Sequence, residues 1–142
     1  MGVAAAQDAL VTVVSQALGI PVQLGMPVTM PPGLAAYVGL GWREEPRPMD
    51  ASGTHEKRVA TLHVVLTYVA AVPAGVSPTA PRNALVTAVE TVQSAIQRNR
   101  TLSGTAVFAE AVPVDVPEPQ RDENGMLYAE ATIDVQVTGY VA

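Results

Sequence analysis

The clearest pattern along the chain is the alternation of apolar and polar residues near its C-terminal end. From Met126 to Ala142 the odd-numbered positions are apolar or small, whereas most even-numbered positions from Tyr128 to Tyr140 are polar. Successive side chains of a β-strand point to opposite faces of its sheet. The pattern therefore predicts a long strand with one buried face, and a second face that meets water or a polar partner surface.

A second long strand is predicted over residues 57–72. Its apolar residues fall on both alternating sets, with Leu62 and Leu66 on one face and Val65 and Val69 on the other. A strand that is apolar on both faces is typical of the interior of a sheet. We therefore expect this strand to be central.

Two segments carry apolar residues at helical spacing. The first covers residues 4–18 and is expected to stop at Gly19. The second begins at Pro78 or Pro81, which suit the first turn of a helix, and runs to about Arg98. Asn99 is expected to take a left-handed cap. The inward stripe of the second helix is predicted to be Leu85, Val89, Val92 and Ile96.

The remaining segments are shorter. Prolines restrict any strand around residues 22–24 to a short or edge position, and further strands are predicted over 35–41 and 105–114. Residues 115–125 read as an acidic loop with a turn at Asn124 and Gly125. The chain is therefore predicted to form one α+β domain over residues 1–142, a mainly antiparallel β-sheet with two α-helices packed on one face.

Residues 42–56 are predicted to be a long exposed loop or arm, because prolines, glycine and many charged residues separate two apolar segments. The arm begins with Trp42, the single tryptophan of the chain. Tryptophan and arginine are enriched at the energetic centres of interfaces, although a tryptophan that pins the base of the loop is an equal alternative. The candidate interface residues are Trp42, Arg43, Glu44, Glu45, Arg47, Met49 and Asp50.

Composition narrows the class of protein. The 142 residues suit one domain, and the absence of cysteine excludes disulfides, thiolate metal sites and a cysteine nucleophile. No apolar run approaches the roughly 20 residues that a membrane-spanning helix needs, and residues 1–18 lack the basic start of a signal peptide. We expect a soluble protein with no membrane partner.

The charge of the chain argues against binding to nucleic acid. The net charge is −5, and residues 105–142 contain Arg121 as their single basic residue. A protein that holds DNA by its phosphates needs a basic face. We expect that DNA could pass such a surface but would not be bound. The acids of this segment are Glu110, Asp115, Glu118, Asp122, Glu123, Glu130 and Asp134.

No residue set predicts catalysis. His55 and His63 lack the spacing of helical metal ligands, and the carboxylates show no pairing suited to acid–base work. We therefore predict no enzyme activity, no catalytic residue, no metal site and no cofactor. His63 is best explained as a sheet histidine bonded to a neighbour. The alternative is a small enzyme or ligand-binding domain whose pocket uses His63 with Glu130 or Asp134.

Several segments together resemble a known family. The turn Thr101-Leu102-Ser103-Gly104-Thr105 is the best local match, and it is joined by the N-terminal helix, the proline-rich stretch at 27–32 and the arm. In these features the chain resembles the tail terminator family of long-tailed bacteriophages, also described as minor tail or tail completion proteins. The resemblance brings no catalytic residue.

The resemblance implies a structural virion protein. Such a protein forms a hexameric ring that caps the tail tube, ends tube polymerisation and joins the tail to the head connector. Its partners would be itself, the tail tube protein and the head–tail connector or stopper protein. Its location would be the head-proximal end of the phage tail, after assembly in the host cytoplasm. Another connector or stopper protein, or the tail tube protein itself, remains an alternative.

Two expectations link the residues to a ring. The long strands 57–72 and 126–141 are expected to offer edges that a neighbouring subunit could pair with or cover. Acidic side chains are expected to line a lumen and keep DNA from adhering. The candidate lumen residues are Glu118, Asp122, Glu123, Glu130 and Asp134.

Overall fold

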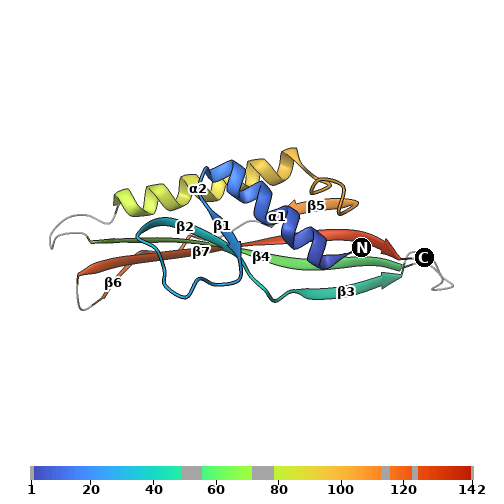
Figure 1. The fold of residues 1–142 in the computed structure, drawn as a ribbon, viewed down its shortest axis with the longest axis horizontal. Coiled ribbons are helices and arrows are strands. Elements are labelled where there is room, and N and C mark those ends of the chain that lie inside the picture. Colours follow the sequence, from blue (N-terminus) through green and yellow to red (C-terminus); the bar gives the residue numbers. More distant parts are fainter. Residues whose placement is uncertain (1, 49–55, 72–78, 113–115, 123–124, 142) are drawn as a thin grey trace.

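The structure is a computed structural model that describes residues 2–48, 56–71, 79–112, 116–122 and 125–141. Two helices lie on one face of a mixed, mostly antiparallel sheet (Figure 1). The predicted α+β class and the placement of both helices on one face are confirmed. In chain order the elements are α1 (Val3–Leu18), β1 (Val22–Leu24), β2 (Gly33–Val38), β3 (Arg43–Pro48), β4 (Glu56–Ala71), α2 (Thr79–Arg98), β5 (Phe108–Ala111), β6 (Gln120–Arg121) and β7 (Met126–Val141).

The centre of the sheet is the antiparallel pair β4 and β7, which pair without a break from Glu56↔Val141 to Ala71↔Met126. On its other side β4 pairs with β3 through one half and with β2 through the other half. β7 similarly takes β5 and β6 on its far side. The prediction that the two long strands offer free edges is therefore wrong for β4, because β3 and β2 pair with its residues 56–61 and 64–69. For β7 it is wrong only in part, because β5 and β6 pair with residues 135–138 and 127–128, and no described strand pairs with the same side of residues 129–134.

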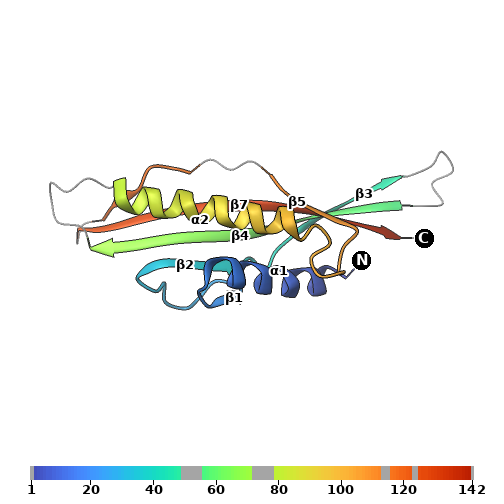
Figure 2. The same ribbon diagram turned by 90° about the horizontal axis from the view of Figure 1, so that it is seen from above.

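The core lies between this sheet and the helices. The predicted inward stripe of α2 is buried, and so is the apolar set of β7 from Leu127 to Val137. In Figure 2 α2 lies above β4 and β7, whereas α1 lies on the side of β1 and β2. α1 ends where Gly19 adopts a left-handed conformation (φ 67°) and its N–H bonds to the carbonyl of Ser15. Among the described residues no helix covers the opposite face of the sheet, which we call the helix-free face.

The turn after α2 differs from its prediction. Asn99 is not left-handed; instead Leu102 and Ser103 have positive φ (45° and 58°), followed by Gly104. The N–H of Asn99 still bonds to the carbonyl of Ala95, and its side-chain oxygen accepts the N–H of Ser103. The chain therefore reverses later than expected, and this reversal buries Leu102 completely in the core.

The predicted arm is in large part a strand. Residues 43–48 form β3 along the edge of β4, with Pro46 opposite Arg58. Two prolines are tolerated here because an edge strand can turn the side that lacks N–H groups toward solvent. Residues 49–55 of the predicted arm, including Met49, Asp50 and His55, lie outside the described residues. Where β3 is described, the expected irregular loop is wrong.

Four other predictions hold, two of them with shifted strand ends. β1 is short and lies at the sheet edge beside β2, as expected. β2 covers residues 33–38 rather than 35–41, and β5 is shorter than the predicted strand 105–114. Pro81 lies in the first turn of α2.

Candidate functional site

The helix-free face of the sheet carries the polar residues of β7. At its middle, strand register places His63 of β4 opposite Asp134 of β7. The Nδ1 atom of His63 lies 2.7 Å from Oδ1 of Asp134, and both side chains remain partly exposed. This pair supports the prediction of a sheet histidine bonded to a neighbour. It also brings together two residues of the alternative pocket hypothesis.

Two tyrosines lie around Glu130 on the same face. The hydroxyl of Tyr128 donates a hydrogen bond to the Glu130 carboxylate. Burial, reinforced by this bond and by the negative charge of Glu130, raises the pKa of Tyr128 to about 12. Burial and then the charge of Glu130 also raise the pKa of Tyr37. Both tyrosines are therefore neutral hydroxyl groups beside a carboxylate at ordinary pH.

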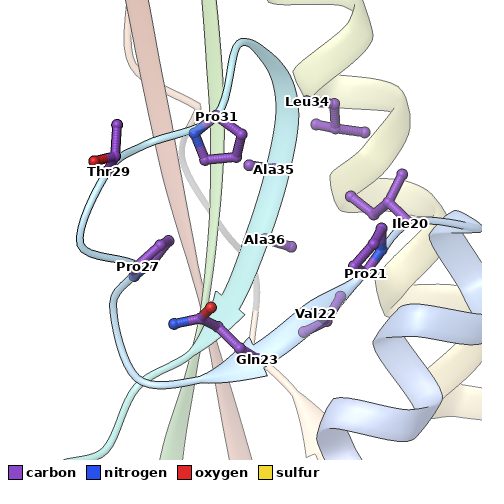
Figure 3. Close-up of a pocket in the computed structure, with 10 residues that line it drawn as sticks. All are labelled: Ile20, Pro21, Val22, Gln23, Pro27, Thr29, Pro31, Leu34, Ala35 and Ala36. Carbon is purple, nitrogen blue, oxygen red and sulfur yellow. The ribbon is translucent and has the colours of Figure 1, made fainter.

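One end of the helix-free face is covered by the loop between β1 and β2. The hydroxyl of Thr67 lies 3.4 Å from the sulfur of Met30, and Thr67 is buried. Beside this loop is a cavity of about 480 Å³ (Figure 3). Its lining residues are Ile20, Pro21, Val22, Gln23, Pro27, Thr29, Pro31, Leu34, Ala35 and Ala36.

The lining of this cavity is mainly apolar. Its polar side chains are Gln23 and Thr29, and it includes neither His63 nor the carboxylates of the pocket hypothesis. The amide of Gln23 donates to the carbonyl of Gly25 and so supports the loop. The hypothesis of a pocket that uses His63 with Glu130 or Asp134 is therefore not supported by this cavity.

The segment that leads into β3 exposes two large apolar side chains. We call it the arm edge and define it as Leu40, Trp42 and Arg43, the first residue of β3. The Trp42 side chain is 48% exposed, and Leu40 is more exposed still. The Arg43 guanidinium is 79% exposed and bonds to Glu45 at 3.0 Å. Glu44 lies 3.8 Å from Arg58 of β4. Arg47 lies in β3, although its side chain is outside the described residues.

A buried glutamine holds the base of the arm edge. Gln7 of α1 is 3% exposed. Its Nε2 atom donates to the carbonyls of Gly39 and Leu40 at 3.0 and 3.2 Å. These bonds fix the backbone immediately before Trp42. Sequence reasoning missed this role, because one polar residue on a helix gives no sign of its partner 32 residues away.

The opposite edge of the sheet also exposes apolar side chains. We call it the β5 edge and define it as Val107, Phe108 and Glu110. Phe108 is 41% exposed, and Val107 and Glu110 are exposed as well. The guanidinium of Arg100 lies 4.9 Å from the centre of the Phe108 ring, a cation–π contact. The predicted strand over 105–114 includes these residues, but three consecutive apolar side chains give no sign that Phe108 is exposed.

The predicted lumen acids do not gather at one place. Glu130 and Asp134 lie on the helix-free face, since they belong to the polar set of β7. Asp122 lies at the β6–β7 turn, where its side chain accepts the N–H of Met126 at 2.9 Å. Glu118 is exposed in the preceding segment, and Glu123 is outside the described residues.

Two searches over the described part of the chain bear on other classes of site. It contains no group of three or more His, Asp or Glu side chains placed to hold a metal ion. Neither of its helices combines the length and the apolar character required to cross a membrane.

Comparisons with known proteins give likenesses to solved structures and no sequence relative. No protein-family model matches the chain, and no curated protein matches it. A chain in the solved structure titled "Virion of native gene transfer agent (GTA) particle" is 17% identical, and the alignment covers 94% of each chain with a TM-score of 0.34. A likeness at this level leaves function to be argued from the residues of the chain itself.

Proposed function

We propose that this protein is a structural component of a phage virion. In this proposal it forms a homo-oligomeric, hexameric ring at the head-proximal end of the tail. The ring caps the tail tube, ends its polymerisation and joins it to the head connector. The observation that carries the proposal is the exposed Trp42, held by Gln7 at the start of an edge strand.

The placement of Trp42 supports an assembly role. A half-exposed tryptophan at a strand edge contributes little to its own domain but can bury a large area against a partner. Its neighbours Leu40 and Arg43 add further exposed contact groups. Tryptophan and arginine of this kind are enriched among the residues that dominate binding energy. The resemblance to tail terminators in the segment 101–105 points to the same class of function.

The helix-free face suits the inner wall of such a ring. Glu130 and Asp134 place carboxylates on this face, and the register adds Glu45 and Glu110 to the same side. The register also places three basic residues on this side, Arg43 and Arg47 of β3 and Lys57 of β4. These four carboxylates exceed the three basic residues by one, so the face has a slight negative excess and no basic patch that would hold DNA phosphates. In this proposal DNA passes without specific binding.

Related structural roles and a binding role form the alternatives. A connector or stopper protein, or the tail tube protein, would use the same kind of surfaces in another position of the virion. The cavity of about 480 Å³ beside β1 instead favours a small apolar ligand. A ligand-induced rise in melting temperature would favour binding, and such a ligand should act equally on a Trp42→Ala variant.

The test uses the tail tube protein of the same phage. Purified tube protein is allowed to polymerise with and without this chain, and tube lengths are measured by negative-stain electron microscopy. We expect shorter tubes with a ring at one end, and the Trp42→Ala variant should cap poorly. Tubes of unchanged length with no bound chain would contradict the terminator role. Incorporation of the chain along the whole tube would favour a tube protein.

A further inference from the structure

We propose that the arm edge of one copy docks against the β5 edge of the next copy. The interface would join Leu40, Trp42 and Arg43 to Val107, Phe108 and Glu110. This inference rests on the proposed ring, and it adds which surface receives the arm.

The two edges border the same part of the sheet. There the strand order is β3-β4-β7-β5, so β3 and β5 lie on opposite sides of the central pair. Phe108 pairs with Thr138, Thr138 with Val59, and Val59 with Glu45. Phe108 thus lies level with Glu45, and Trp42 directly precedes Arg43, so the two exposed aromatic residues lie on either side of the level of Arg43. Two exposed apolar patches on one small domain are typical of interaction surfaces.

Arg43 and Glu110 carry opposite charges on the two edges, while Arg43 also bonds to Glu45 of its own chain and Arg100 lies beside Phe108. Glu110 pairs with Gln136, Gln136 with Thr61, and Thr61 with Arg43. Arg43 and Glu110 are thus the two ends of one row of paired residues that runs across the four strands, and both side chains are exposed. When a second copy is placed beside the first at the same level, its Glu110 faces Arg43. This complementarity selects a second copy of the chain as the occupant of the β5 edge.

Side chains, rather than added strands, would make this contact. The outer side of β3 lacks N–H groups at Pro46 and Pro48. On β5, the N–H of Ala109 already bonds to the carbonyl of Arg100. Both edges are therefore blunted against continuous sheet pairing. Trp42 and Phe108 remain available for contact, because both are partly exposed.

The two surfaces are different, so the contact is head-to-tail. A head-to-tail interface repeats until its rotation closes a ring. It leaves the helix-free face of every copy on the same side of the assembly. This arrangement fits the proposed inner wall.

Cysteine pairing tests the contact directly, because the native chain contains no cysteine. Arg43→Cys and Glu110→Cys variants are mixed under mild oxidation and resolved on a non-reducing gel. We expect a disulfide-linked dimer in the mixture and none from either variant alone. The matched control replaces Glu110→Cys with Glu90→Cys, on the exposed side of α2, and should not cross-link. Equal cross-linking by this control would overturn the inference.

Charge reversal supplies the second measurement. Arg43→Glu and Glu110→Arg should each weaken self-association by about tenfold or more, and the double variant should recover it. If the unmodified chain forms rings, but the cysteine variants do not cross-link and the double charge variant does not recover self-association, the docking inference fails and the proposed function stands. If it forms no oligomer, alone or with tail tube protein, both fail.

Discussion

Replacing Gln7 by methionine tests how α1 holds the base of the arm edge. Methionine has nearly the shape of glutamine but cannot donate to the carbonyls of Gly39 and Leu40. Each hydrogen bond contributes about 0.5–1.5 kcal/mol net, so the loss of both should lower the free energy of unfolding by about 1–3 kcal/mol. For a domain of this size each kcal/mol lowers the melting temperature by about 2–4 °C. We expect a decrease of about 2–12 °C.

The assay is thermal unfolding by circular dichroism, with Gln16→Met as the matched control. Gln16 lies on the exposed side of the same helix, so its variant should change the melting temperature by less than about 2 °C, in line with other surface substitutions. A second readout is quenching of the single tryptophan by acrylamide, which should increase in Gln7→Met because the backbone before Trp42 loosens. Equal melting temperatures and equal quenching in the two variants would refute the positioning role of Gln7.

Three further outcomes are expected. Leu102→Ala should lower the free energy of unfolding by about 2–5 kcal/mol because Leu102 is fully buried, whereas Ser103→Ala in the same turn should cost about 0.5 kcal/mol or less in denaturant unfolding. The raised pKa of Tyr128, about 12, keeps its hydroxyl protonated in the folded chain while an unfolded tyrosine ionises near pH 10. The contribution of Tyr128 to the free energy of unfolding should therefore be complete below about pH 10 and decrease as the pH rises toward about 12. Tyr128→Phe should flatten the curve of unfolding free energy against pH over this range. Trp42→Ala should change unfolding by about 1 kcal/mol or less but weaken self-association by about tenfold or more in light scattering; equal losses in both would contradict an interface role.

The sequence predicted the parts of the fold that follow from periodicity. The alternation in β7 and the two apolar faces of β4 identified the central pair, and helical spacing identified both helices within a residue or two of their ends. These signals are local, because burial of one face imposes a fixed period on each element. They are also strong, since each is repeated over many residues.

The edge strands could not be predicted in the same way. Residues 43–48 read as a loop because Pro46 and Pro48 are unfavourable in most strands. Their pairing depends on β4. In the folded sheet β2 pairs with only one half of β4, and β3 pairs with the other half. The same dependence on register hid the opposition of Arg43 and Glu110. No local sequence pattern shows which residues of two edge strands lie at the two ends of the same row of paired residues.

The candidate site was predicted unevenly. Trp42 was selected because a lone tryptophan beside arginine is unusual in a charged segment, and it proved half-exposed at an edge. Phe108 and Gln7 were missed because their roles depend on exposure and on distant carbonyls. The histidine–carboxylate pair was partly foreseen, since His63 lay on a mixed face of a predicted central strand.

The central claim is that copies of this chain associate into a closed ring. The most direct test is the molar mass of the purified chain by size-exclusion chromatography with light scattering, alone and after mixing with tail tube protein. We predict a discrete hexamer of the 14.8 kDa chain, with the emission of Trp42 shifted to shorter wavelength as its ring becomes buried. A monomer under both conditions, with unchanged emission, would contradict it.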